Sequence, residues 1–198
     1  MENISKKIFT EEDASTFSAE HLVIPEGFTE VQGSALLSFK KVTFPSSMTK
    51  LDKVAFFFCA VSLEQIIVDP DNPHYCDIDG VLFSKDKSVL ICYPNEKSEL
   101  EYIIPDSVKK IGKTAFAYCV NLKSVHIPDS VEKIENYAFW VCKGLKKITI
   151  PASVKCIGLR AFCELYGSTG IYVDAANQFY SDTDNVGCNK VQNPVVFY

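Results

Sequence analysis

Cysteine and histidine are the residues of this chain that could do covalent or metal chemistry. The sequence has eight cysteines and three histidines, which are Cys59, Cys76, Cys92, Cys119, Cys142, Cys156, Cys163, Cys188, His21, His74 and His126. Zinc and redox sites usually contain C-x-x-C, and a serine nucleophile often sits in G-x-S-x-G, but neither pattern occurs here. His74, beside Cys76, has no second ligand pair at a suitable spacing, so we interpret it as a solvated loop residue. The sequence therefore predicts no catalytic residue and no metal ligand.

The Asp77-x-Asp79-Gly80 segment resembles part of a calcium-binding loop. With Gly80 at the sixth position of an EF-hand loop, the first ligand would be Tyr75 and the twelfth Asp86 rather than Glu. Because the first ligand is absent, we interpret the two aspartates as turn formers that hydrogen-bond their own backbone. We expect no cofactor.

Composition is that of a soluble globular chain. Of 198 residues, 23% are charged and 47% hydrophobic, and the net charge is −5. This balance argues against nucleic acid as the main partner, because phosphate binding needs clustered Lys and Arg. No apolar run approaches the roughly 18 residues of a membrane span, so we expect no membrane insertion. The first residues, MENISKKIFTEEDASTF, lack the apolar stretch of a signal peptide, which favours a cytoplasmic location if Met1 is the native start.

A unit of 23 residues, I-P-x-S-V-x-x-I-x-x-x-A-F-x-x-C-x-x-L-x-x-[IV]-x, recurs in register through the middle of the chain. It runs from Ile104-Pro105 to Ile127-Pro128 and on to Ile150-Pro151, without insertion or deletion. An internal repeat of roughly 20–50 residues indicates a solenoid or array. Shortened or extended copies flank the strict ones.

Each unit predicts one strand and one turn. The L-x-x-I-x-I segment ends in alternation, which indicates a short strand, and the proline ends it. The spacings in S-V-x-x-I-x-x-x-A-F suit a short helical or 3₁₀ turn, which the serine at 107, 130 and 153 would cap. Phe116, Phe139 and Phe162 share one repeat position and should stack into an aromatic spine.

The repeat cysteines Cys59, Cys119 and Cys142 also share one position. Free cysteine is among the most buried residue types, so we interpret this position as packing. Disulfides between neighbouring units are the alternative, since stacked strands lie about 4.8 Å apart and bridged Cα atoms about 4.4–6.8 Å apart.

Segments outside the strict repeat divide the chain. Residues 72–81 align without gaps to 177–186, and both segments predict an Asx-rich turn followed by a β-hairpin. We therefore expect an N-terminal cap over 1–20, with a helix beginning at Thr10, and a solenoid over 21–174. A hairpin module at about 70–100 would interrupt the solenoid, and a cap with a degenerate hairpin would cover 175–198.

The repeat, joined to the hairpin motif N-P-x-Y-x-x-x-D-G-V-L-F-S-K-D that begins at Asn72, resembles the BspA-type leucine-rich-repeat proteins over residues 21–186. The pattern departs from the family at the edges, where Leu165 replaces the cysteine and Asp184-Asn185 replaces D-G. The resemblance implies a curved parallel sheet, a binding or adhesion role, surface display in many members and no catalytic residues. The resemblance favours the cell surface or secretion, whereas the first residues favour the cytoplasm, so the location stays open.

Repeat and resemblance together predict an α/β repeat solenoid. We expect a right-handed leucine-rich-repeat superhelix with a parallel β-sheet on one face, short helical or 3₁₀ turns on the other, and β-hairpin insertions.

The outward side chains of the predicted strands form two columns across the units. These candidate partner-binding residues are Val23, Thr43, Ile67, Ile103, His126, Thr149 and Tyr172 in one column, and His21, Lys41, Gln65, Glu101, Ser124 and Lys147 in the other. An apolar stripe with a polar rim is typical of a partner-binding surface. The alternative is that β-branched residues simply suit strands, and the hairpin could cover Ile67 and Ile103.

We therefore expect a non-enzymatic module that binds a protein or glycan through the strand face. The second hypothesis is a self-associating structural module, a homo-oligomer formed through the hairpin or the C-terminal edge. An enzyme of unrecognised type is a distant third.

Overall fold

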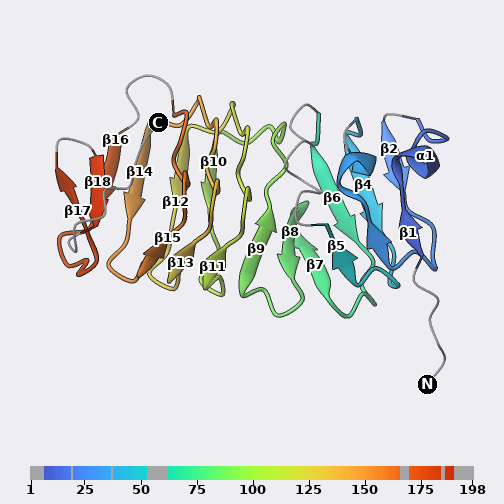
Figure 1. Ribbon diagram of the computed structural model, residues 1–198, viewed down its shortest axis with the longest axis horizontal. Coiled ribbons are helices and arrows are strands. Elements are labelled where there is room, and N and C mark those ends of the chain that lie inside the picture. The colour runs from blue at the N-terminus through green and yellow to red at the C-terminus, as the bar shows by residue number, and fades with distance from the viewer. Residues whose placement is uncertain are drawn as a thin grey trace.

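The computed structural model describes residues 7–18, 20–36, 38–52, 62–165, 170–183 and 186–189. The chain forms an elongated solenoid whose turns, or rungs, stack along the long axis (Figure 1). Its elements are β1 (Ile8–Phe9), α1 (Glu11–Ala14), β2 (His21–Val23), β3 (Glu30–Val31), the 3₁₀ helix η1 (Gly33–Leu36), β4 (Lys41–Phe44), β5 (Lys50–Leu51), β6 (Gln65–Val68), β7 (Tyr75–Ile78), β8 (Val81–Ser84), β9 (Val89–Cys92), β10 (Glu101–Ile103), β11 (Lys110–Ile111), β12 (Ser124–His126), β13 (Lys133–Ile134), β14 (Lys147–Ile150), β15 (Cys156–Ile157), β16 (Gly170–Val173), β17 (Tyr180–Thr183) and β18 (Val186–Asn189).

The strands gather into sheets on two sides of the solenoid. One side, which we call the column sheets, has the parallel orders β2-β4-β6 and β10-β12-β14-β16. The other side, the back sheets, has the orders β1-β3-β5 and β15-β13-β11-β9-β8-β7. In Figure 1 the column sheets occupy the upper half of the solenoid and the back sheets the lower half. The predicted parallel strand face is confirmed.

The expectation of helical turns on the opposite side is wrong. The V-x-x-I segments form two-residue parallel strands, as in Lys110–Ile111 beside Lys133–Ile134. A spacing of three residues fits a turn equally well, but stacked rungs offer the amides of this segment acceptors on the preceding rung, and the amide of Lys110 uses Ser88 O at 3.1 Å. Among the described residues, helix is limited to α1 and η1. The protein is thus a β-solenoid rather than an α/β fold.

The A-F segment of each rung forms a ladder with the next rung instead of a helix. The amide of Phe116 donates to Ala138 O, and that of Phe139 to Ala161 O, both at 2.7 Å. The alternate amides bond within their own rung, as Ala138 N does to Glu135 O at 3.3 Å. Alternation between the two kinds of bond satisfies the backbone without a helical turn.

The aromatic spine is confirmed. The rings of Phe116 and Phe139 stack with centroids 4.8 Å apart and planes at 6°, and Phe139 and Phe162 stack at 5.3 Å and 10°. All three rings are buried. Identical side chains at one repeat position therefore superimpose directly in the core.

The repeat serines do not cap turns. Ser130 Oγ donates to Val108 O at 2.8 Å, and Ser153 Oγ donates to Val131 O at 2.7 Å. Each serine thus tethers its rung to the preceding one, because no helical N-terminus is present for it to cap.

The repeat cysteines pack in the core as expected. Cys119 and Cys142 are buried free thiols, and Cys142 Sγ lies 2.9 Å from Phe116 O, a carbonyl of the preceding rung. Burial raises the pKa of the Cys119 thiol, which keeps it protonated. Cys59 and the Cys188 side chain lie outside the described residues, and the six described cysteines are free rather than bridged.

The N-terminal cap contains the helix expected at Thr10, but it has only four residues. The Thr10 amide donates to the Asp13 carboxylate at 2.9 Å, and Thr10 Oγ1 accepts from the Asp13 amide at 3.4 Å. The first of these bonds lowers the pKa of Asp13. In the same segment, β1 pairs with β3 and adds a rung to the back sheet.

The hairpin β7–β8 turns at Asp79 and Gly80, whose φ angles of 50° and 79° lie in the left-handed region. Two such residues in a two-residue loop match the twist of antiparallel strands. Asp79 lies in the turn as expected, but Asp77 is not a turn former, since its carboxylate accepts the amide of Val68 in β6 at 2.8 Å. In the second hairpin, β17–β18, the turn at 184–185 lies outside the described residues.

Strand β8 forms a wall between two apolar clusters. Val81 and Phe83 belong to the cluster of the C-terminal rungs, and Leu82 belongs to that of the N-terminal rungs. Successive strand residues point to opposite faces, and all three side chains are fully buried. The hairpin is therefore part of the core.

A buried amide fastens this hairpin to the preceding rung. The Asn72 Nδ2 donates to Pro45 O at 2.8 Å and to Met48 O at 2.9 Å. Its Oδ1 accepts from the amides of His74 and Tyr75, both at 2.9 Å. Asn72 is fully buried, and these bonds engage both ends of its side-chain amide.

The second hairpin repeats this arrangement. The Asn177 Nδ2 donates to Pro151 O and Val154 O at 2.8 and 3.1 Å, and its Oδ1 accepts from the amides of Phe179 and Tyr180 at 2.8 Å. The alignment of 72–81 with 177–186 thus identifies a common anchor, although its role was not apparent from the residues.

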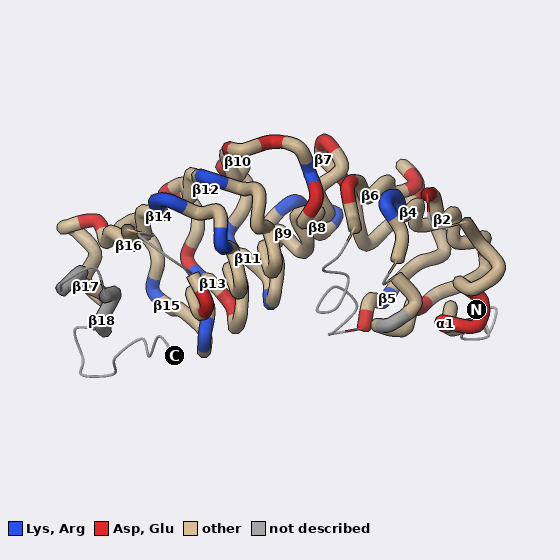
Figure 2. Tube along the Cα trace, turned by 90° about the horizontal axis from the view of Figure 1, so that it is seen from above, with Lys and Arg blue, Asp and Glu red and all other residues tan. Residues whose placement is uncertain are grey.

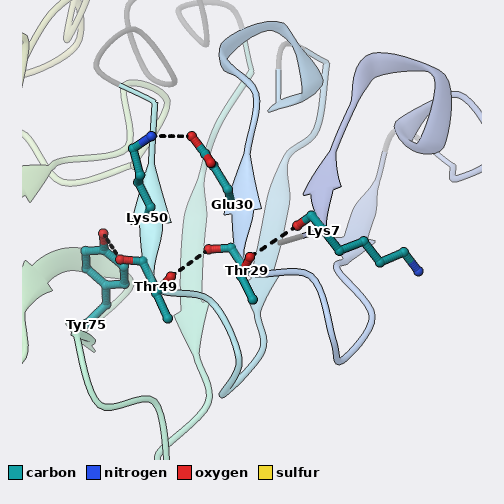
Figure 3. A network of polar contacts seen from close by, with 6 residues as sticks. All are labelled: Lys7, Thr29, Glu30, Thr49, Lys50 and Tyr75. Atoms are coloured by element: carbon teal, nitrogen blue, oxygen red, sulfur yellow. Dashed lines mark hydrogen bonds and ion pairs between the residues drawn. The ribbon is translucent and has the colours of Figure 1, made fainter. Parts of the chain in front are cut away.

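A chain of hydroxyl groups extends along the N-terminal back sheet to the first hairpin (Figure 3). Thr29 Oγ1 donates to Lys7 O at 3.5 Å, and Thr49 Oγ1 donates to Thr29 O at 3.1 Å. The Tyr75 hydroxyl donates to Thr49 O at 3.3 Å. Strands β1, β3 and β5 are joined by backbone hydrogen bonds. The side-chain hydroxyl of Tyr75 then links β7 to the residue before β5.

Candidate interaction face

The outward residues of the column sheets, which we call the column face, carry the candidate residues in aligned sets. In the three-stranded sheet the sets are His21, Lys41 and Gln65, and Val23, Thr43 and Ile67. In the four-stranded sheet they are Glu101, Ser124 and Lys147, then Ile103 and His126, and Thr149 and Tyr172.

The columns are divided in two rather than continuous. Strands β6 and β10 belong to different sheets, and the first hairpin lies at the edge of β6. The amide of Ile66 donates to Gly80 O at 3.0 Å, and that of Val68 donates to Asp77. The hairpin takes donors that a neighbouring strand would have used, so the repeat spacing alone could not place this break.

Three apolar side chains of the column face are open to solvent. Ile103 is 74% exposed, Val23 47% and Tyr172 42%. Ile67 is half-buried at the break, which fits partial cover by the hairpin, whereas Ile103 is uncovered. The face therefore presents separate apolar anchors, one on each side of the break and one near the C-terminal end.

Polar side chains of this face make contacts between adjacent strands. His21 Nε2 and Thr43 Oγ1 lie 2.9 Å apart across adjacent strands. Lys147 Nζ lies 5.0 Å from the centre of the Tyr172 ring, within the range of a cation–π contact. Each of these contacts joins two neighbouring rungs.

A cleft of about 490 Å³ opens at the break between β6 and β10. Two predicted residues line it, Lys41 and Gln65, together with six residues that sequence reasoning missed: Glu64, Asp79, Glu96, Lys97, Ser98 and Glu99. Two features of the sequence could have indicated these residues. The repeat is lost after residue 92, and the charged run E-K-S-E follows at 96–99.

The cleft carries an excess of negative charge, with four carboxylates against two lysines. Lys97 Nζ lies 2.7 Å from Glu99 Oε1, and this hydrogen bond lowers the pKa of Glu99. Asn121 Nδ2 donates to Glu96 Oε2 at 3.3 Å. The cleft therefore presents hydrogen-bond acceptors and negative charge in a concave surface. A partner with complementary donors or positive charge could be recognised there.

A group of half-buried aromatic residues on the turns was also missed. The rings of Tyr118 and Trp140 meet edge to face at 4.9 Å, and Tyr137 lies 6.0 Å from Trp140. Trp140 Nε1 donates to Glu164 Oε1 at 3.2 Å. The residues preceding the repeat cysteine vary in type, so no pattern pointed to this group.

In the part of the chain that the structure describes, no three His, Cys, Asp or Glu side chains are grouped so that they could hold a metal ion. The same part contains no helix with the length and apolar character needed to cross a membrane.

A family model described as a BspA type leucine rich repeat region, with six copies, matches residues 2–90 and 91–182. The comparison with curated proteins gives no match.

Among solved structures, a leucine-rich repeat protein from Eubacterium ventriosum ATCC 27560 is 26% identical with a TM-score of 0.69, covering 85% of this chain and 46% of that one. The pneumococcal vaccine antigen PcpA is 22% identical with a TM-score of 0.64, covering 86% and 54%. A leucine rich cell surface protein from Faecalibacterium prausnitzii A2-165 is 23% identical with a TM-score of 0.55, covering 90% and 53%. This chain spans about half the length of each of these structures.

Proposed function

Because this chain belongs to the BspA-type leucine-rich-repeat family, whose members are generally non-enzymatic repeat proteins, we propose that it is an interaction or adhesion module that binds a protein or glycan through its column face. The observation that carries the proposal is the combination of an exposed Ile103 in β10 with an acidic cleft that the loop before β10 forms with β4, β6 and the turn of the first hairpin. Exposed apolar anchors with a polar rim are typical of partner-binding surfaces.

Binding would rest on shape and on a few anchors rather than on covalent chemistry. Ile103 and Tyr172 supply apolar area at two places on the four-stranded sheet. The cleft supplies carboxylates that a partner's donors or cations can reach. Because a few well-packed residues usually carry most of the binding energy, one substitution on this face should have a large effect.

The test is binding of the purified protein to an immobilised array of glycans and glycoproteins. We expect Ile103→Asp to weaken the strongest interaction at least tenfold, since it places a charge in the contact. Leu159→Asp, which changes an equally apolar residue that is 63% exposed but lies beyond β15 on the back side, is the matched control. Equal losses in the two variants, or no binding to any member of the array, would contradict the proposal.

Self-association is the second candidate function. It is favoured by β15, which among the described residues is the edge strand of the back sheet and carries an exposed Cys156, because the edge of a sheet can pair with a second copy. The Tyr180 hydroxyl of the second hairpin occupies one donor of this edge, the Ile157 amide, at 2.8 Å. The hairpin is a weaker candidate than its sequence suggested, since β8 is buried between the two clusters. Light scattering over a range of concentrations tests this candidate: a strict monomer under reducing conditions would rule it out.

A further inference from the structure

Three exposed lysines lie at the start of two adjacent strands of the column sheets, since Lys123 and Lys146 directly precede β12 and β14, and Lys147 is the first residue of β14. The Lys146 amide donates to Lys123 O at 2.9 Å, and Lys147 is aligned with Ser124. Adjacent strands lie about 4.8 Å apart, so Lys123 and Lys146 carry like charges on neighbouring positions. Figure 2 shows blue segments, which mark Lys or Arg, at β12 and β14. We call Lys123, Lys146 and Lys147 the lysine ladder.

Other stacked lysines of this solenoid are neutralised. Lys110 and Lys133 are aligned in the back sheet, and both reach Glu135 Oε1, at 3.7 and 3.3 Å. Lys155 pairs with Glu132 at 2.9 Å. The back sheet thus offsets the repulsion between aligned lysines with carboxylates on the same rungs.

The lysine ladder has no such carboxylate. Among the described residues, Lys123, Lys146 and Lys147 form no ion pair. Lys147 makes a cation–π contact with the Tyr172 ring. Aligned like charges are unfavourable, so the free protein keeps a repulsion that a bound anion would relieve. The arrangement is complementary to a polyanion.

The neighbouring rung adds an exposed aromatic ring. Tyr172 is aligned with Thr149 and is 42% exposed, and the Lys147 ammonium lies above its ring. A sugar ring offers an apolar C–H face to an aromatic ring while its charged substituents extend to the sides. An acidic peptide lacks this flat face next to its charges, so the combination of ring and lysines favours a saccharide.

Negative charge limits this surface on one side. Glu101 is aligned with Ser124 on the rung before the ladder, and the acidic cleft lies beyond it. Figure 2 shows red segments along the loop before β10, with blue between them. An anionic chain would therefore be held over β12, β14 and β16 and repelled from β10.

We propose that the lysine ladder and Tyr172 form a binding site for an anionic polysaccharide, one that bears sulfate or carboxylate groups. This inference rests on the proposed function, since it names the class of partner for the C-terminal half of the same face. The lysines bind the anionic groups, Tyr172 stacks on a sugar ring, and the exposed His126 and Thr149 supply hydrogen bonds beside them.

The experiment measures binding of the full chain to heparin, hyaluronan, uncharged dextran and polyglutamate by biolayer interferometry. We expect heparin to bind, dextran not to bind, and heparin affinity to fall about 20- to 40-fold between 50 and 200 mM NaCl, since about three charges are neutralised. The double variant Lys123→Glu, Lys146→Glu should lose at least tenfold in heparin affinity. Tyr172→Ala should lose about fivefold, because it removes the stacking surface.

The matched control is the double variant Lys133→Glu, Lys155→Glu, which makes the same change in net charge on the back sheet. It should alter heparin affinity less than about twofold. Equal losses in the two double variants, or polyglutamate binding as tightly as heparin, would overturn the proposal. A protein that binds its array partner through Ile103 but ignores heparin would refute this inference and leave the proposed function standing.

Discussion

The strict rungs from Ile104 to Phe162 and the interrupted region around the first hairpin hold their neighbours in different ways. In the strict rungs identical side chains superimpose, as in the stack of Phe116, Phe139 and Phe162. Around the hairpin the same task is done by buried polar side chains, foremost Asn72. The strict rungs thus add ring stacking to their backbone ladder, whereas the hairpin region adds buried polar anchors to the apolar packing of β8.

The difference shows how an inserted hairpin changes the hydrogen bonding between stacked rungs. A strict period places each backbone donor opposite an acceptor on the next rung, so packing can be entirely apolar. Where the period breaks, the backbone groups lose those partners. The amide of Val68 then bonds to Asp77, that of Leu63 to Asn95 Oδ1 at 3.3 Å, and the cleft opens beside them. The irregular region thus carries both the polar anchors and the shaped surface.

The largest effect is expected from breaking the apolar stack. Phe139→Ala removes the central ring of the spine and leaves a cavity, so the free energy of unfolding should fall by about 3–5 kcal/mol. The neighbouring Trp140 is the single tryptophan of the chain, and its fluorescence in urea reports the transition. Phe139→Leu, which keeps much of the volume, should cost only about 1–2 kcal/mol. Equal costs would show that the stack contributes little.

The polar anchors come next and allow the two hairpins to be compared. Asn72→Ala leaves two buried carbonyls and two amides without their partner, which should cost about 2–4 kcal/mol. Asn177→Ala removes the same bonds near the C-terminal end, where only the last rung can fray, so we expect about 1–2 kcal/mol.

Hydrogen exchange separates these two variants. Asn72→Ala should increase exchange in β6, β7 and β8, whereas Asn177→Ala should affect only β15, β16 and later residues. Similar exchange patterns in the two variants would mean that position in the stack does not decide the cost of losing an anchor.

The smallest effect concerns the turn of the first hairpin. Gly80 has a φ of +79°, and a Cβ there would lie 2.9 Å from Gln65 Cγ. Gly27 has a φ of +93° with nothing within 4 Å of its Cβ position. Gly27→Ala should therefore cost about 1 kcal/mol from backbone strain alone, and Gly80→Ala about 2 kcal/mol from strain and crowding. Thermal unfolding measures both, and a larger loss in Gly27→Ala would disprove the crowding.

Much of the strict region could be predicted from its residues, and the interrupted region could not. The shared position of Phe116, Phe139 and Phe162 predicts stacking, because a fixed period superimposes equal positions. The V-x-x-I spacing, by contrast, fits a helical turn and a short strand equally well, and only the acceptors of the neighbouring rung make Lys110–Ile111 a strand.

The candidate site divides in the same way. Alternation in the strands predicts which side chains of the column face point outward, and the register agrees for sets such as Glu101, Ser124 and Lys147. The cleft was not predictable, because Glu64 and Glu96 come together only when the hairpin separates β6 from β10. That Lys123 and Lys146 have no carboxylate partner could also not be predicted, because it depends on where every nearby carboxylate lies in the folded protein.

By itself the sequence determined the period, the residues that superimpose and the outward columns, because these depend only on spacing along the chain. The tertiary structure alone decided that both sides of the solenoid are sheets, that β8 divides the core in two, and that the column face splits into an acidic cleft and a lysine ladder. These features depend on which rung supplies each hydrogen-bond acceptor or countercharge, and that is a property of contacts between residues far apart in the sequence.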